Sequence, residues 1–471
     1  MHRRHRAKLM QRIRDLPAPG LPPRSLLLLQ GGASRCRDET DDEPLFRQES
    51  AFHYLFGVRE PDVYGTINAD TCAATLYVPR LPEAYTVWQG AILPPEHFRD
   101  YYGVDRALYS DQLKEDFAAA APTRVFLSRG YNQDGKAWSV PASFDGLETF
   151  PVDATTLLYD LIVECRLIKT DEEIALMQYT NNITSDAHLE VMRRARPGMF
   201  EYQLESLFLH DVYFRGKCRH AAYTSICGCG PNSAVLHYGH AAAPNDRLIG
   251  EGDMLLLDMG AEYHRYASDV TCSFPASGKF SADQRAVFEA VAAAQSAVMD
   301  AMRPGVRWPD MHALAYDVIC RRLAAMGLLR GSGGGDSKAN VGAVFMPHGL
   351  GHLMGIDTHD VGGYPAGAAR DPRPGFASLR CVRTLVPGMV ITVEPGTYFI
   401  DALLDKALAD PALNRFLVPE ALQRFRGFGG VRLEDDVLVT ADGVRNLTNC
   451  PRTVADIEGV MAGRITNRQQ L

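Results

Sequence analysis

The chain has 471 residues, more than one hydrophobic core usually supports, so two domains are expected. A hydrophobic content of 46%, a charged content of 23% and a net charge of −8 are those of an ordinary globular protein, and they exclude a surface built to neutralise phosphates, so we expect no nucleic acid partner. No run of about 18 apolar residues is present, which excludes a membrane-spanning helix and predicts no membrane partner.

The first third of the chain alternates predicted strands with helical stretches. Residues 25–29, 74–78 and 124–127 are short apolar runs that predict strands, and residues 95–102 predict a helix between them. This alternation indicates a layered α/β domain. The basic residues 1–6 could belong to a targeting segment, but they lack the apolar core of a signal peptide, and the residues after them continue as a surface helix.

A change of pattern separates a second domain. Thr170 and Glu173 form a capping box, and apolar residues at helical spacing follow it. Long amphipathic helices then alternate with pairs of strands, which predicts an α+β domain. We place the two domains at residues 1–160 and 161–471. The glycine-rich residues 331–336 predict a loop between two helical segments.

Ten cysteines are scattered along the chain rather than grouped in a disulfide framework. Cys227 and Cys229 form a C-x-C pair, but no second pair lies at the distance of a zinc site. We interpret all ten as reduced thiols, which predicts a cytoplasmic protein.

The first candidate site is a pair of acids. Asp258 lies near the end of an apolar run, and Asp269 follows it after the turn-prone residues 262–265. If the two segments fold as a hairpin, Asp258 sits opposite Asp269 with the Cβ atoms about 5 Å apart, a separation that a metal ion can bridge and that bare like charges disfavour. The alternative is one buried acid at a strand end and one solvated acid in a turn.

A glycine-rich segment carries three histidines, His348, His352 and His359. Its glycines disfavour a regular helix and allow close backbone approach, which predicts a site-forming loop. The first two histidines need not share a helical face, and the glutamate of the HExxH motif is absent, so the segment does not predict a zincin. The alternative for each histidine is a structural role.

Two further acids lie on predicted strands. Glu394 ends an apolar strand that Pro395 stops. Arg432 and Glu434 share one face of a later strand, opposite its apolar residues. An acid buried there without a partner would be costly, so the alternative for each glutamate is that it faces solvent or an arginine.

Together these positions supply four carboxylates and one histidine from β-rich segments. Such an oxygen-rich set suits Mn²⁺, Co²⁺ or similar divalent ions better than a thiolate zinc site does. The charge of two divalent ions balances four carboxylates and leaves room for a bridging hydroxide. Two metals about 3.5–4 Å apart lower the pKa of bound water and polarise a carbonyl, so the hypothesis is a hydrolase.

Motifs spread over nearly the whole chain resemble the M24 metallopeptidases, and within them the prolidases. Besides the candidate acids and histidines, the matching segments are residues 45–50, 223–228, 234–239 and 424–430. The resemblance implies an α+β fold with a pita-bread catalytic domain and an N-terminal α/β creatinase-like domain. It also implies hydrolysis of dipeptides with a C-terminal proline (Xaa-Pro), in which a hydroxide that bridges two metal ions attacks the scissile carbonyl.

The resemblance also implies roles for individual residues. Two divalent ions, for which Mn²⁺ is the usual activating metal in prolidases, would be held by Asp258, Asp269, His352, Glu394 and Glu434. Glu394 would also be the catalytic proton shuttle. Further catalytic and substrate-binding residues would be His237, His359, Arg380 and Tyr223.

The chemistry of these substrate residues is consistent with a proline-ended dipeptide. The planar fork of Arg380 suits a carboxylate close to the cleaved bond, and His237 and His359 suit the carbonyl oxygen or the carboxylate. Without the resemblance, Arg380 would be interpreted as a surface arginine. The resemblance further implies a homodimer in which the segment of Trp88 reaches toward the partner's active site, and the alternative for Trp88 is burial in its own domain.

Three rival functions remain at this point. An aminopeptidase P-like enzyme, which removes the residue before proline from longer peptides, would share all five ligands. A methionine aminopeptidase would leave the large N-terminal domain and the Arg380 region without a purpose. A non-catalytic pita-bread binding protein would be expected to have lost ligands, and none is missing here.

Overall fold

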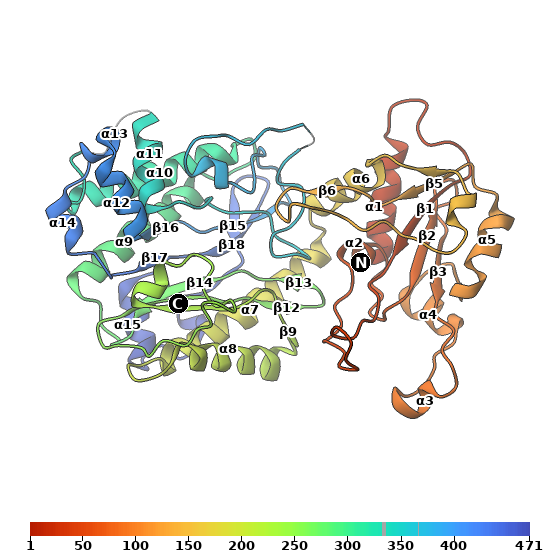
Figure 1. Ribbon diagram of the computed structural model, residues 1–471, viewed down its shortest axis with the longest axis horizontal. Helices are drawn as coiled ribbons and strands as arrows, with labels where there is room; N and C mark the ends of the chain where they lie inside the picture. Colours follow the sequence, from red (N-terminus) through yellow and green to blue (C-terminus); the bar gives the residue numbers. More distant parts are fainter. Residues whose placement is uncertain (332–335, 366) are drawn as a thin grey trace. The chain divides into compact units, whose positions relative to one another are not determined.

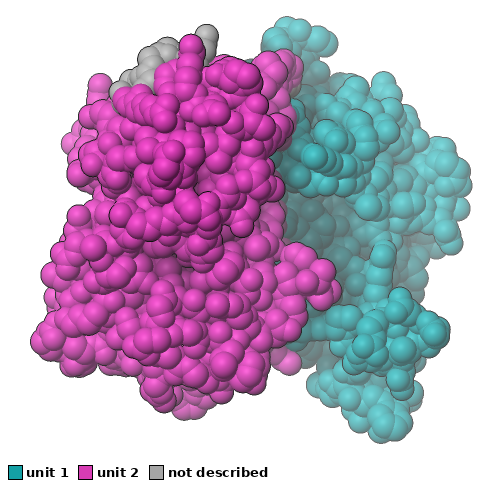
Figure 2. Space-filling model, turned by 60° about the vertical axis from the view of Figure 1, so that its left-hand side comes forward, with its two compact units in different colours: residues 1–166 teal, residues 167–471 magenta. Residues whose placement is uncertain are grey.

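The computed structural model describes residues 1–331, 336–365 and 367–471, so residues 332–335 of the predicted glycine-rich loop lie outside the described residues (Figure 1). The described chain divides into two units, Met1–Arg166 and Leu167–Leu471 (Figure 2). Within the three described ranges, no helix is both long enough and apolar enough to cross a bilayer.

The first unit is built on a mixed six-stranded sheet in the order β4-β3-β2-β1-β5-β8. Neighbours β1 and β2, and β2 and β3, are antiparallel, and the other three pairs are parallel. The predicted strands are β1, β3 and β5, and the predicted helix is α4. The strands are β1 (Ser25–Gln30), β2 (Tyr64–Asn68), β3 (Ala74–Val78), β4 (Arg106–Tyr109), β5 (Arg124–Leu127), β8 (Val152–Asp153) and the separate pair β6 (Tyr131–Asn132) and β7 (Ala137–Trp138). The helices are α1 (His2–Arg14), α2 (Ser50–Phe56), α3 (Tyr85–Trp88), α4 (Pro95–Tyr102), α5 (Leu113–Ala120) and α6 (Leu157–Leu167).

Helix α1 is the surface helix predicted at the start of the chain, because one of its faces is exposed and the other is packed. It begins at His2, and Leu9, Met10 and Ile13 on one face are buried. Even the basic Arg6 is buried, and its Nη1 donates a hydrogen bond of 2.9 Å to the carbonyl oxygen of Leu55. Hydrophobic residues at helical spacing among the cations therefore decide how this helix packs.

The second unit places short sheets between two groups of helices (Figure 1). Helices α7 and α8 pack on each other and against β10, β12 and β13, whereas α9 packs on α10 and against β15, β16 and β17. The helices are α7 (Asp171–Arg194), α8 (Glu201–Gly216), α9 (Ala282–Ala301), α10 (Trp308–Ala325), α11 (Asp336–Phe345), α12 (Asp401–Ala409), α13 (Pro411–Asn414), α14 (Pro419–Gln423) and α15 (Val454–Met461). The strands are β9 (His220–Ala221), β10 (Ile226–Cys229), β11 (Met254–Asp258), β12 (Ala261–Tyr263), β13 (Tyr266–Ala267), β14 (Thr271–Pro275), β15 (Val390–Val393), β16 (Gly396–Tyr398), β17 (Gly430–Arg432), β18 (Asp435–Val439) and β19 (Val444–Asn446).

The start of α7 confirms the predicted capping box. The Thr170 hydroxyl accepts a hydrogen bond of 3.4 Å from the Glu173 backbone N–H, and the Glu173 carboxylate accepts one of 2.8 Å from the Thr170 N–H. Two backbone donors that the helix leaves without partners are thereby satisfied, so α7 begins at Asp171.

The ribbon that carries the first two acids has a different register from the predicted one. Asp258 pairs with Thr271, not with Asp269. The register is set at the tip, where Tyr263 pairs with Tyr266 around a two-residue turn, His264-Arg265, with φ of 47° and 72°. Because this tight turn fixes which residues face each other along the ribbon, the predicted direct pairing of the two acids was wrong.

Candidate metal centre and active site

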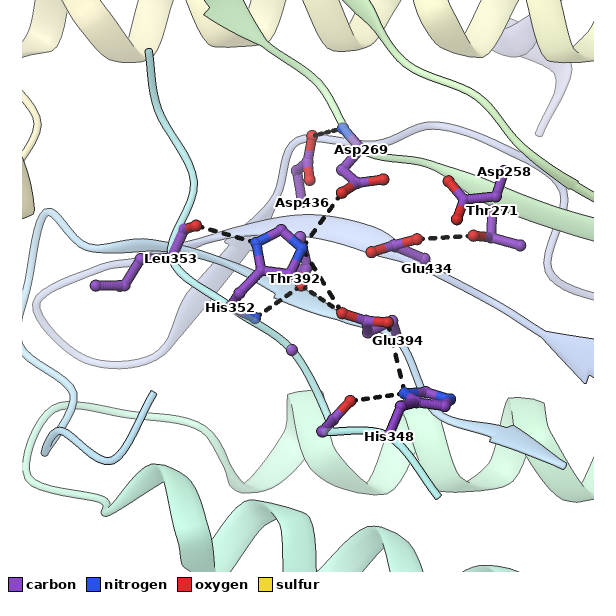
Figure 3. A network of polar contacts seen from close by, with 12 residues as sticks. Asp258, Asp269, Thr271, His348, His352, Leu353, Thr392, Glu394, Glu434 and Asp436 are labelled. Carbon is purple, nitrogen blue, oxygen red and sulfur yellow. Dashed lines mark hydrogen bonds and ion pairs between the residues drawn. The ribbon is translucent and has the colours of Figure 1, made fainter. Parts of the chain in front are cut away.

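Four acids and one histidine from separate segments converge in the second unit (Figure 3). Asp258 ends β11, Asp269 lies just before β14, and Glu394 follows β15. Glu434 lies between β17 and β18, and His352 lies in the glycine-rich loop before β15. The side chains point toward one another from the edges of these strands.

His352 lies between the acids, and its ring contacts two of them. Its Nε2 atom is 3.3 Å from Asp269 Oδ2 and 3.7 Å from Glu394 Oε1. Asp269, His352 and Glu434 each present one ligand atom within 4.8 Å of the others. The Nδ1 atom lies 3.0 Å from the carbonyl oxygen of Leu353, which can only accept, so Nδ1 carries the proton and Nε2 presents its lone pair to the acids.

Backbone pairing brings these distant residues together. Thr271 forms an antiparallel bridge with Glu434, whose N–H donates a hydrogen bond of 3.2 Å to the Thr271 carbonyl. The backbone N–H of Thr392 donates one of 2.9 Å to the carbonyl of His352. Gly351 permits this approach, because a Cβ atom there would lie 2.0 Å from the Thr392 carbonyl oxygen. The glycines of this loop thus serve the close approach that the sequence predicted.

Hydrogen-bond donors hold the acids in orientation. The Tyr223 hydroxyl donates to Asp258 Oδ1 over 2.6 Å, and Arg432 Nη2 donates to Asp258 Oδ2 over 2.7 Å. The Thr271 hydroxyl donates to Glu434 Oε2 over 2.7 Å. Each carboxylate oxygen has two lone pairs, so one donor per oxygen leaves capacity for a metal ion.

Negative charge is in excess at this centre. Burial, followed by the neighbouring acids, raises the pKa of Asp269 and Glu434 well above the usual range. Burial also raises the pKa of Glu394 to about 7, although His352 and Arg432 oppose the shift. Buried acids that raise one another's pKa are fitted to bind cations, which take the place of protons as compensating charge. Four carboxylates and one imidazole match oxygen-preferring divalent ions.

The four predicted substrate residues lie around the acids. His237 and His359 are exposed, whereas Tyr223 and Arg380 are partly buried. The His359 ring meets the His352 ring edge to face, with centroids 4.4 Å apart. Partial burial, and then the charge of Arg380, lowers the pKa of His237. The pKa of His359 falls well below its usual value because protein atoms surround the ring and because His352 and Arg380 are near, so both histidines are neutral at neutral pH.

A hydrogen-bond network behind the acids includes Tyr398, a residue that the sequence did not predict. Arg432 Nη1 donates to the Tyr398 hydroxyl over 2.8 Å, and His348 Nε2 lies 3.0 Å from the same hydroxyl. His348 Nδ1 lies 2.8 Å from the Gly349 carbonyl and carries the proton, so Tyr398 donates to Nε2. The sequence indicated that Arg432 lies near the acids, because it shares a predicted strand face with Glu434. No pattern in the sequence indicated that Tyr398 belongs to the site.

Two further residues that contact the acids were also missed. Thr271 holds Glu434, as described above, and the Asp436 carboxylate accepts a hydrogen bond of 3.0 Å from the backbone N–H of Asp269. Both lie on or beside strands among apolar residues, where a polar side chain could equally serve packing or a turn. Their role depends on the pairing of segments about 160 residues apart, which no local pattern reveals.

A buried centre in which four acids face the single positive charge of Arg432, beside neutral histidines, is the arrangement expected of a metal-dependent hydrolase. The sequence pattern of Metallopeptidase family M24 matches residues 175–441, and that of the Aminopeptidase P N-terminal domain matches residues 2–126. The chain therefore belongs to the M24 metallopeptidases, a family that implies divalent metal ions. Its fold, an N-terminal α/β domain followed by a pita-bread catalytic domain, confirms the predicted class.

Similar proteins match almost the full length of the chain. The Xaa-Pro dipeptidase of Homo sapiens is 56% identical over 459 residues, which cover 98% of this chain and 92% of that protein. A probable Xaa-Pro aminopeptidase of Coccidioides posadasii is 36% identical and covers 95% of this chain and 94% of its own. Among solved structures, aminopeptidase PepP of Pseudomonas aeruginosa superimposes with a TM-score of 0.77 at 30% identity, covering 98% of both chains.

Proposed function

We propose that this protein is an Xaa-Pro dipeptidase, which hydrolyses dipeptides that end in proline. The observation that carries the proposal is the 56% identity to the human Xaa-Pro dipeptidase over 98% of the chain, together with an intact acidic centre. The match to probable Xaa-Pro aminopeptidases is weaker, at 36% identity or less. A non-catalytic role has no support from the centre, because all four acids and the imidazole are present.

We assign the metal ligands to Asp258, Asp269, His352, Glu394 and Glu434, and we propose that they hold two divalent ions, normally Mn²⁺. Support comes from their convergence, from the excess of negative charge and from the proton position on His352, which directs Nε2 toward the acids. When bound, the ions polarise the scissile carbonyl and make water a nucleophile at neutral pH.

Residues of the chain transfer the proton and bind the substrate. Glu394, which is partly exposed at the edge of the centre, accepts a proton from the attacking water and delivers it to the proline nitrogen that leaves. His237 and His359, both neutral, donate hydrogen bonds to the carbonyl oxygen or the substrate carboxylate. Arg380 binds the proline carboxylate through its planar fork, and Tyr223 orients Asp258.

The activity test compares a dipeptide with a tripeptide after metal removal. The chelated protein should leave Gly-Pro intact, and added Mn²⁺ should restore hydrolysis. Gly-Pro-Gly, whose carboxylate lies one residue further from the cleaved bond, should be cleaved with a kcat/KM about 100-fold lower, because Arg380 loses its partner. Equal or faster cleavage of Gly-Pro-Gly would favour the aminopeptidase P-like activity.

We also propose a homodimer in which the segment of Trp88 meets the partner. Trp88 is 82% exposed and Val87 is 77% exposed, so the alternative that Trp88 is buried in its own domain was wrong. A tryptophan with that exposure is well suited to an interface, where aromatic residues are enriched. Light scattering should give about twice the chain mass of 51.9 kDa, and a Trp88→Ala variant should lower the dimer fraction or the activity per chain.

We further place the protein in the cytoplasm. No disulfide joins any of the ten cysteines, all of which belong to the described residues. Most of these thiols are buried, as expected of a protein that folds and stays in a reducing compartment. Fluorescence microscopy of the tagged chain tests this proposal, and accumulation inside an organelle would contradict it.

A further inference from the structure

A deeply buried ion pair lies at the end of the histidine loop, the glycine-rich residues 348–359 that carry His348, His352 and His359. Lys169 Nζ and Asp360 Oδ2 are 3.0 Å apart, and each side chain is 1% exposed. Lys169 belongs to the segment before α7, where its backbone N–H donates a hydrogen bond of 2.8 Å to the Gly388 carbonyl. Asp360 directly follows His359, one of the proposed substrate residues. The pair therefore ties the end of the histidine loop to the frame of the second unit.

Stability alone does not explain such a pair. Removing two charges from water is so unfavourable that a well-packed apolar pair of similar volume is often equally stable or more stable. A buried pair does differ from an apolar pair in one respect, because its attraction depends on one defined arrangement of the two groups. The pair can therefore hold the backbone of its two segments in one arrangement.

The backbone next to Asp360 forms a bend that the ion pair contacts. The Asp360 N–H donates a hydrogen bond of 2.9 Å to the Leu353 carbonyl, so the chain folds back on itself just after His352. Gly355 lies in the bend, and a Cβ atom there would be 2.4 Å from Asp360 Oδ2 and 3.0 Å from Lys169 Cε. The ion pair thus packs directly against the bend that places His359 beside His352.

Among the described residues, no hydrogen bond fixes the His359 side chain. The residue is partly accessible to solvent, and within the described parts of the chain its ring meets the His352 ring edge to face but has no hydrogen-bond partner. Its position is therefore decided by the backbone of its loop. We propose that Lys169 and Asp360 form a positioning pair that holds the His359 ring in place for the substrate. This inference rests on the proposed dipeptidase function.

The kinetic test is a double-mutant cycle between Lys169→Met and His359→Ala, with Gly-Pro as substrate and Mn²⁺ as the metal. In the wild-type background, Lys169→Met should lower kcat/KM by about 100-fold, the effect of a misplaced substrate-binding group, with the same division between kcat and KM that His359→Ala shows. In the His359→Ala background it should change kcat/KM by no more than about 2-fold, because no ring remains to be positioned. Equal losses in both backgrounds would overturn the proposal.

Two further variants separate positioning from general damage. Lys279→Met makes the same chemical change at an ion pair with Glu458, where Lys279 is 67% exposed, and it should leave kcat/KM within about 2-fold of wild type. If Lys169→Met does not fold, the apolar pair Lys169→Met with Asp360→Leu should fold, because neither charge is left buried alone. The folded double variant should still show the loss of kcat/KM, and full activity in it would overturn the proposal.

A structural measurement keeps the inference separate from the proposed function. In a crystal structure of the Lys169→Met variant, the metal sites should be occupied as in wild type, whereas the His359 ring should leave its position 4.4 Å from the His352 ring. An unmoved ring would overturn the positioning role, whatever the activity. Failure of the wild-type protein to cleave Gly-Pro would instead count against the proposed function.

Discussion

Glu434 and Asp435 are neighbours in the chain, and both are almost fully buried, yet their surroundings differ completely. Asp435 faces Arg452, whose Nη2 and Nε atoms donate over 2.6 Å and 3.0 Å, and Asn446 donates over 2.9 Å. Glu434 receives one hydrogen bond from the Thr271 hydroxyl, and its other strong interactions include repulsion by acids. One acid is compensated by the chain, and the other is not.

The difference shows how a metallopeptidase divides its buried charges. Successive side chains of an extended chain point to opposite sides, so one residue step separates an acid that holds the structure together from an acid that serves the centre. Asp435 belongs to a complete ion pair, whereas the pKa of Glu434 is raised by burial and by Asp269 and Glu394. Asp435 therefore has a cation from the chain as its partner, whereas the proposed ligand Glu434 lies in a group of acids that a bound cation would compensate.

The sharpest way to break this comparison is to neutralise each acid in turn and measure activity. Glu434→Gln should lower kcat/KM for Gly-Pro by about 1,000-fold or more, with loss of bound metal, because an amide is a far weaker ligand than a carboxylate. The neighbouring Asp435→Asn should retain bound metal. Activity assays with metal analysis by mass spectrometry check both, and full metal content with wild-type kcat in Glu434→Gln would refute the ligand assignment.

The free energy of unfolding should show the reverse order, with the larger loss in Asp435→Asn and not in Glu434→Gln. Asp435→Asn removes one partner of a buried pair and leaves Arg452 without its counter-charge, which should cost about 3–5 kcal/mol of unfolding free energy. In metal-free protein, Glu434→Gln should instead raise the unfolding free energy, since it removes repulsion among the acids. Urea unfolding of both chelated variants measures this, and equal losses would mean that Glu434 is an ordinary structural acid.

The pH dependence of the metal-free protein sharpens the comparison further. The folded-state pKa of Glu394 is raised to about 7 from an ordinary value of 4.5, so between these pH values the folded protein binds more protons than the unfolded chain. The stabilisation by this group is complete below pH 4.5 and is lost as the pH rises through 7, by roughly 1–3 kcal/mol. The difference between wild type and Glu394→Gln should follow this slope in chelator, and bound metal should abolish it.

The smallest expected effect concerns the hydroxyl that orients Glu434. Thr271→Val keeps the shape of the side chain but removes the donor to Glu434 Oε2, and it should weaken metal binding by about 10–100-fold without unfolding the protein. Titration of the chelated variant with Mn²⁺ measures the affinity. Thr180→Val, which removes a buried hydroxyl that donates to the carbonyls of Leu176 and Tyr266, is a control with the same chemistry and should leave the metal affinity unchanged. An effect at Thr271 no larger than at Thr180 would contradict the role of Thr271.

The parts of this molecule that were predictable are those that local pattern controls. The capping box at Thr170 and Glu173 starts a helix wherever it occurs, because it satisfies donors within one turn of itself. The apolar runs of β1, β3 and β5 likewise predict buried strands from their own residues alone. The predicted pairing of Asp258 with Asp269 was wrong, because the two-residue turn at His264-Arg265 makes Thr271 the partner of Asp258. The residue types in this segment do not show at which two residues the chain turns.

The amino-acid sequence by itself determined the chemistry of this protein: which acids and histidines are present, which loops contain the glycines that permit close approach, and which family the chain belongs to. Only the tertiary structure decided that Arg452 compensates Asp435 and leaves Glu434 among acids, that Tyr398 joins Arg432 to His348, and that Lys169 meets Asp360 behind the histidine loop. The reason is physical, since the free energy of a buried charge depends on the partners that distant segments bring to it, and no residue carries that information in its own neighbourhood.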